Sequence, residues 1–163
     1  ACEWIKFGRP SALGAVTGMV AGLGTITPAS GFVGPGGALI IGILAGFVCY
    51  NATVFLKQRL KIDDSLDVFP VHGVGGALGT ILVAIFASAG LGVFSGQGLA
   101  DGMTIASQLQ VQVIGVLASA AYTAIATFVI LKLVDMMLGL RVSADDETEG
   151  LDLNQHNERG YDL

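Results

Sequence analysis

The sequence predicts an all-α polytopic membrane protein, on the grounds of its composition, its long apolar stretches and the placement of its charges. Of its 163 residues, 53% are hydrophobic and only 13% are charged. Soluble domains usually carry about 25% charged residues. Each of four apolar stretches reaches the length of about 20 residues that a helix needs to cross a bilayer. A bundle of transmembrane helices is therefore the expected fold.

Prolines, glycines and charged clusters delimit the four expected helices, which cover about residues 11–31, 35–56, 68–90 and 104–138. The last of these would measure about 52 Å as one straight helix, more than the bilayer accommodates at a usual tilt. Its first third holds Gln108, Gln110 and Gln112. The early turns are therefore expected outside the hydrocarbon, or else the helix is strongly tilted.

The charges divide the chain into a neutral body and an acidic tail. Residues 139–163 hold seven of the thirteen acidic residues and two of the eight basic ones, which leaves six of each in 1–138. A neutral body with an acidic tail gives no electrostatic basis for binding nucleic acid, so that class of function is excluded. The positive-inside rule places the basic residues of the chain in the cytoplasm, namely Lys6, Arg9, Lys57, Arg59, Lys61 and Arg141. In a plasma or inner membrane protein, residues 1–10 are therefore expected to form a cytoplasmic lead-in and residues 139–163 a cytoplasmic tail.

Glycines recur at four-residue spacing in the first predicted helix, at Gly14, Gly18 and Gly22. Such stripes let the backbones of transmembrane helices approach closely. Close packing is expected of them, in preference to a direct role in a pore. Further glycines, Gly73, Gly75 and Gly76, are expected to pack closely in the third helix.

His72 is the one ionisable side chain of the third apolar stretch, 68–90. A histidine inside a membrane is a functional hypothesis by default, the alternative being a packed, neutral ring bonded to a backbone carbonyl. Burial would disfavour the imidazolium, and a neutral ring offers one donor and one acceptor to a small polar molecule. The glycines on the same face indicate either a close helix crossing or free space.

Asp67 directly precedes this stretch and is the expected N-cap of its helix. No metal site or cofactor is expected, because His72 has no further ligand nearby and His156 lies in the tail. Cys2 and Cys49 have neither CxxC spacing nor a third ligand type close by, so neither a disulfide nor a metal site is expected of them.

The stretch Asp67-Val68-Phe69-Pro70-Val71-His72-Gly73-Val74-Gly75-Gly76 resembles the DVFxVHGxGG signature of the Amt/Mep/Rh family of ammonium transporters. Residues 22–33 resemble the family's AGLxxITPASGxV segment. In the tail, residues 139–142 and 149–152, with His156, resemble its GLRV…EGLD…H pattern. The tail departs from the family at His156-Asn157-Glu158-Arg159, where HGE is common, which puts regulation through the tail in doubt.

The resemblance implies that the chain is the C-terminal part of a transporter, with the last four of eleven helices, in a homotrimer. His72 would be the second of two pore histidines and Val68 would face the pore beside it. The first histidine would lie upstream of Ala1, where further residues are expected because the chain opens without Met. The substrate would be ammonium or ammonia. A PII-type signalling protein would dock at the cytoplasmic face, with Gly150, Leu151, Asp152 and His156 in a regulatory tail.

Besides transport, a histidine in a membrane helix can serve an enzyme or a sensor. A membrane enzyme with His72 as general base would need a nucleophile or metal partner, which residues 68–90 do not offer. An ammonium sensor with a transporter-like fold remains the alternative, because occupancy of the same pore would serve both purposes.

Overall fold

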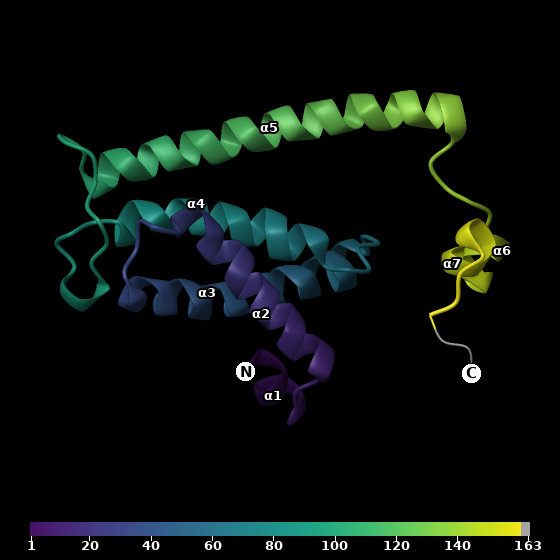
Figure 1. Cartoon of the computed structure of the whole chain (residues 1–163), viewed down its shortest axis with the longest axis horizontal. Coiled ribbons are helices and arrows are strands. Elements are labelled where there is room, and N and C mark those ends of the chain that lie inside the picture. The colour runs from purple at the N-terminus through teal and green to yellow at the C-terminus, as the bar shows by residue number, and fades with distance from the viewer. Residues whose placement is uncertain (161–163) are drawn as a thin grey trace. The chain divides into compact units, whose positions relative to one another are not determined.

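The computed structural model describes residues 1–160, and within them the regular elements are helices (Figure 1). Residues 161–163, the end of the predicted tail, lie outside the described part. The chain forms two compact units, residues 1–117 and 118–163.

The first unit contains three packed helical rods and the elements that connect them. A short helix α1 (Cys2–Phe7) comes first. Its other elements are α2 (Ala12–Ile26) with the 3₁₀ turn η1 (Thr27–Ala29), α3 (Pro35–Val54) with the π-helical η2 (Phe55–Leu60), the π-helical η3 (Phe69–Val74) with α4 (Gly75–Phe86), the 3₁₀ turn η4 (Gly92–Phe94), and the first turns of α5 (Ile105–Leu138).

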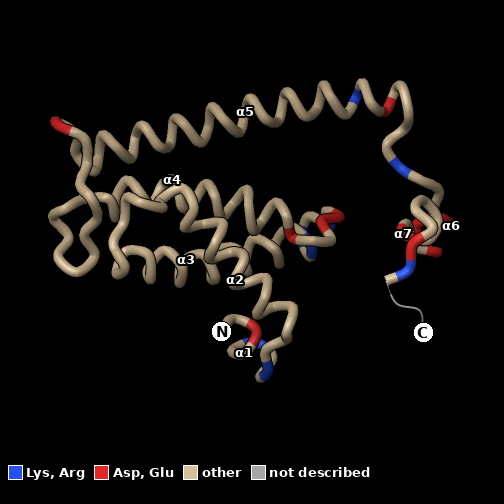
Figure 2. The backbone as a smooth tube through the Cα atoms, in the orientation of Figure 1, with Lys and Arg blue, Asp and Glu red and all other residues tan. Residues whose placement is uncertain are grey.

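The rods α3 and α4 run in opposite directions, α2 crosses them obliquely, and the three pack against one another (Figure 1). One small core cluster joins Ala29, Ile41, Val83 and Ala87, and a second cluster joins Ala21, Cys49 and Val71. Charged residues gather in α1 and between η2 and η3, at the end where α3 stops and α4 starts (Figure 2). The rods themselves are nearly free of charge, as a hydrocarbon environment requires.

Four helices of the described chain are long and apolar enough to cross a membrane, over Ala12–Ala29, Pro35–Leu60, Phe69–Phe86 and Ile105–Leu138. The second extends beyond the predicted end at 56, because η2 continues the rod through the basic cluster. The third stops at Phe86, short of the predicted 90. There the backbone leaves the helix to bond with the following loop: Gly96 N–H donates to Ser88 O at 3.0 Å, and Gly98 N–H to Ala87 O at 2.7 Å.

The second unit holds the rest of α5, then α6 (Ala144–Glu149) and α7 (Leu151–His156). A capping box starts α6: Asp146 N–H donates to Ser143 Oγ at 3.1 Å, and Ser143 N–H donates to the Asp146 carboxylate at 3.3 Å. Arg141 binds Glu147 through two charged hydrogen bonds, of 2.9 and 3.0 Å. The acidic stretch is thus folded into two short exposed helices.

Candidate pore histidine and its supporting turn

The segment 61–68 reverses the direction of the chain and leads into the turn that contains His72. Its cap is Asp64, whose carboxylate accepts hydrogen bonds from the backbone N–H groups of Val68 at 2.9 Å and Phe69 at 2.8 Å. The prediction that Asp67 caps this helix is therefore wrong. Asp67 adopts a left-handed backbone conformation, φ 57°, and its side chain forms an ion pair with Lys57 of η2 instead.

His72 lies in the π-helical η3, and the turn has a buried and an exposed side. Pro70 and Val71 are buried against α2 and α3, whereas His72 is exposed on the described chain. Pro70 has no N–H, so it fits a first turn where intrahelical acceptors are missing. Single π turns in helices are rare overall, but those that occur are often found at functional sites.

The His72 ring lies beside a glycine of α2. Its Nδ1 is 3.6 Å from the position that a Cβ on Gly24 would occupy. No hydrogen bond to the ring comes from any residue in the described part of the chain. Val68, four residues earlier, is 52% exposed. The described chain therefore presents the histidine and the valine on an open, largely apolar surface.

Behind the histidine, the rods approach at backbone distance around Thr25, which is completely buried. A Cβ added to Gly75 would lie 2.7 Å from Thr25 Oγ1 and 3.2 Å from Cys49 Sγ. A Cβ on Gly79 would overlap the backbone oxygen of Thr25 and lie 2.9 Å from its carbonyl carbon. These glycines are required because no side chain fits between α2 and α4 there.

The glycines predicted to pack closely have different surroundings. An added Cβ would meet nothing within 4 Å among the described residues at Gly18, Gly22 or Gly76. At Gly14 it would meet the Glu3 carboxylate of α1. At Gly73 it would meet only a ring of the same turn, that of Phe69, at 3.1 Å. Within the described chain Gly75 therefore lies in a close helix crossing and the other five positions make none; their packing against further helices stays a prediction.

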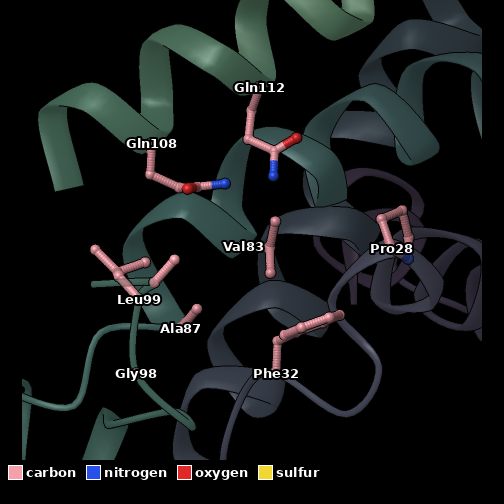
Figure 3. Close-up of a pocket in the computed structure, with 9 residues that line it drawn as sticks. Pro28, Phe32, Val83, Ala87, Gly98, Leu99, Gln108 and Gln112 are labelled. Atoms are coloured by element: carbon pink, nitrogen blue, oxygen red, sulfur yellow. The ribbon is translucent and has the colours of Figure 1, made fainter. Parts of the chain in front are cut away.

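A separate pocket of about 240 Å³ lies near the other end of the rods (Figure 3). Gln108 and Gln112 of α5 extend over an apolar floor that includes Val83, Ala87 and Phe32. None of its lining residues is ionisable, and His72 does not line it. The pocket is therefore distinct from the surface that carries the histidine.

The four predicted tail residues surround the junction of α6 and α7. Gly150 connects the helices with φ 110°, a conformation that favours glycine. Leu151, Asp152 and His156 belong to α7 and are exposed. Exposure leaves them accessible to another molecule, and nothing in the described unit assigns them a partner.

Sequence reasoning missed three contributors to this site: Asp64 as the cap, the lysine that pairs with Asp67, and Gly24 beside the ring. Asp64 stands four residues before Val68, so a cap from that position was open to prediction. The ion pair between Lys57 and Asp67 depends on the reversal of the backbone between them, which has no simple sequence signal. Gly24 falls outside the four-residue glycine stripe and so escaped it.

Comparisons with known proteins agree with this architecture. The model of the Ammonium Transporter Family matches residues 1–161. A putative ammonium transporter of Methanothermobacter thermautotrophicus is 44% identical over 98% of this chain and 39% of its own length. The ammonium transporter Amt1 of Archaeoglobus fulgidus is 44% identical over 97% of the chain and 39% of its own length.

A solved structure supports the same assignment. The crystal structure of the Mep2 mutant delta442 from Candida albicans superposes with a TM-score of 0.71 at 36% identity, over 86% of this chain and 36% of that one. The chain spans about two fifths of the length of the curated relatives it matches, 39%. With its four apolar helices it is part of a multi-pass membrane protein, and it belongs to the ammonium transporter family.

Proposed function

We propose that the full-length protein containing this chain carries ammonium or ammonia across a membrane, and that His72 lies in the path. One observation carries the proposal beyond family membership: His72 is the ionisable side chain of an apolar rod, Phe69–Phe86, and it is exposed rather than packed into the described core. A packed structural histidine would be bonded to a carbonyl. This ring has no such bond in the described part of the chain.

The chemistry follows from the cost of removing charge from water. An ammonium ion that enters an apolar passage loses its hydration, which is expensive unless the charge is neutralised. Loss of a proton yields ammonia, a small neutral molecule that a neutral imidazole can bind through its donor or its acceptor nitrogen. His72 would hold ammonia by this hydrogen bond and relay the proton, with Val68 completing the apolar wall.

Transport is tested in proteoliposomes that contain the full-length protein, by measuring ammonium-evoked current and ammonium uptake together. His72→Ala is expected to reduce transport strongly because both the hydrogen bond and the relay are lost. His72→Asn keeps a donor and an acceptor but cannot take up a proton, so it is expected to lower the charge moved per ammonium taken up. A His72→Ala protein with full, selective transport would contradict the role of His72.

A folded protein that binds ammonium without moving it would instead support a sensor. The relatives are named as transporters, so no observation favours that alternative. The same naming favours a transport protein over an enzyme.

The remaining features of the assembly are proposals that rest on family resemblance. The chain would supply the last four of eleven helices, in a homotrimer in the cell membrane, with residues 139–163 in the cytoplasm. Gly150, Leu151, Asp152 and His156 would take part in regulation by a PII-type protein. Determining the structure of the full-length protein would test the helix number and the trimer. Protease accessibility of the tail in right-side-out vesicles would test its side, and cleavage from outside would refute the proposed orientation.

A further inference from the structure

An ion pair fixes the entry to the turn that carries His72. Lys57 Nζ lies 2.6 Å from Asp67 Oδ1. Lys57 belongs to η2, at the end of the second rod, and Asp67 is the residue directly before Val68. The pair therefore ties the end of one rod to the start of the next, across the reversal at 61–66.

The two partners are in different environments. The side chain of Asp67 is 18% exposed, whereas that of Lys57 is 38% exposed. Asp67 Oδ1 is itself buried and has no other donor among the described residues. Burying a carboxylate oxygen is costly unless a charge or hydrogen bonds compensate it, so Lys57 is needed at this atom. Removing the lysine leaves an uncompensated carboxylate, which can regain water only by moving.

Such movement would be transmitted to His72 through the backbone. Asp67 O accepts a hydrogen bond from Val71 N–H at 3.0 Å, and Val71 immediately precedes the histidine. Asp67 also holds a left-handed conformation, φ 57°, which is uncommon for residues other than glycine, although aspartate adopts it more readily than most. Asp64 already satisfies the N–H groups of Val68 and Phe69, so it does not replace Asp67 in the pair.

We propose that Lys57 and Asp67 are positioning residues that hold the π turn so that His72 faces the open side of the rod. Neither residue touches the substrate in this scheme. The effect on transport rests on the proposed function, whereas the effect on the turn does not. Each can therefore be measured separately.

The experiment uses the full-length protein in lipid vesicles with Lys57→Gln, Asp67→Asn, the exchange of Lys57→Asp with Asp67→Lys, and Arg59→Gln as a control. Arg59 is an exposed cation of the same η2 segment and has no ion pair in the described part of the chain. Two quantities are compared for each variant. They are hydrogen–deuterium exchange of the peptide covering 69–74, and the KM and maximal rate of ammonium transport.

Lys57→Gln is expected to accelerate exchange in 69–74 by about fivefold, the upper range for a partly exposed ion pair. It is expected to reduce the maximal rate by about tenfold with KM within about twofold, because small misplacement of a reacting group mainly slows the reaction. Asp67→Asn leaves no buried charge and is expected to have a smaller effect. The charge exchange should recover part of both losses, and Arg59→Gln should change neither.

Unchanged exchange in Lys57→Gln would overturn the proposal, as would acceleration spread equally over α2, α3 and α4, which would indicate a general loss of stability. If exchange changes and transport does not, the pair holds the turn but does not position His72 for transport, and the proposal is overturned. If the wild-type protein moves no ammonium, the proposed function fails. Localised exchange, restored by the charge exchange, would still support the positioning of the turn.

Discussion

Replacing Gly79 by alanine tests the close crossing behind His72. The added Cβ would overlap Thr25 O and lie 2.9 Å from the Thr25 carbonyl carbon, with Pro28 Cδ at 3.4 Å. Non-bonded carbons prefer about 3.5–4.0 Å, so α2 and α4 would have to separate by at least about 0.6 Å. The obstructing atoms belong to the backbone, so no change of rotamer can relieve the contact.

The expected cost follows from two opposing effects. Overpacking a tight site costs about 1–3 kcal/mol, and a rigid backbone contact belongs at the upper end of that range. Alanine in a helix interior recovers about 1 kcal/mol relative to glycine. The net destabilisation is therefore about 2 kcal/mol. Transmembrane helices associate through this kind of packing, so the lost contact is not replaced by a hydrophobic driving force.

The assay is thermal unfolding of the full-length protein in detergent, with Gly76→Ala as the matched control in the same helix. An added Cβ at Gly76 meets nothing within 4 Å in the described chain, so its helix-propensity gain should leave the midpoint unchanged or slightly raised. Gly79→Ala should lower the midpoint by several degrees. Equal midpoints for the two variants would refute the reasoning.

Three further predictions concern other parts of the chain. Hydrogen bonds from Ser11 N–H and Oγ lower the pKa of Glu3. Their support of the α1–α2 junction is therefore present above the unfolded-state pKa of Glu3 and lost as pH falls through its lowered folded-state value. Protection of the amides of residues 1–11, measured as the exchange rate relative to the intrinsic rate at the same pH, should fall over that range, and constant protection would contradict this. Ser143→Ala should destabilise α6 by about 1 kcal/mol, seen as lost helical chemical shifts in the tail; unchanged shifts would exclude a working cap. The cysteine of Val68→Cys should react with a water-soluble thiol reagent, and ammonium should slow that reaction. The cysteine of Val71→Cys, at a site only 3% exposed, should not react. Equal reaction rates for the two variants would refute the assigned faces.

Hydropathy was sufficient to predict the four apolar helices, because the length and composition needed to cross a bilayer are sequence properties. Their ends were less predictable. The third helix ends at Phe86 because residues 87–98 offer the backbone alternative hydrogen bonds, as between Gly98 N–H and Ala87 O. This bond joins residues eleven positions apart, and a local pattern does not encode it.

The histidine was predictable from its sequence context, but its support was not. Asp63, Asp64 and Asp67 are all within reach of a helix start, and the choice among them depends on backbone conformation. The left-handed φ of Asp67 turns its carboxylate toward Lys57 and leaves the cap to Asp64. A propensity scale treats these aspartates alike, so it does not separate a cap from an ion-pair partner.

The position of His72 is determined by what lies behind it, since no residue of the described chain bonds its ring. Three constraints act on the backbone of its turn: the Asp64 cap, the Lys57–Asp67 pair, and the crossing of Gly75 over Thr25. An imidazole held in this way has no hydrogen bond within the described chain that would compete with a substrate, whereas a ring fixed by its own hydrogen bonds would lose a nitrogen to them. Such a site gains precision from backbone packing, so we expect changes at these supporting residues to alter transport without removing any atom from the path.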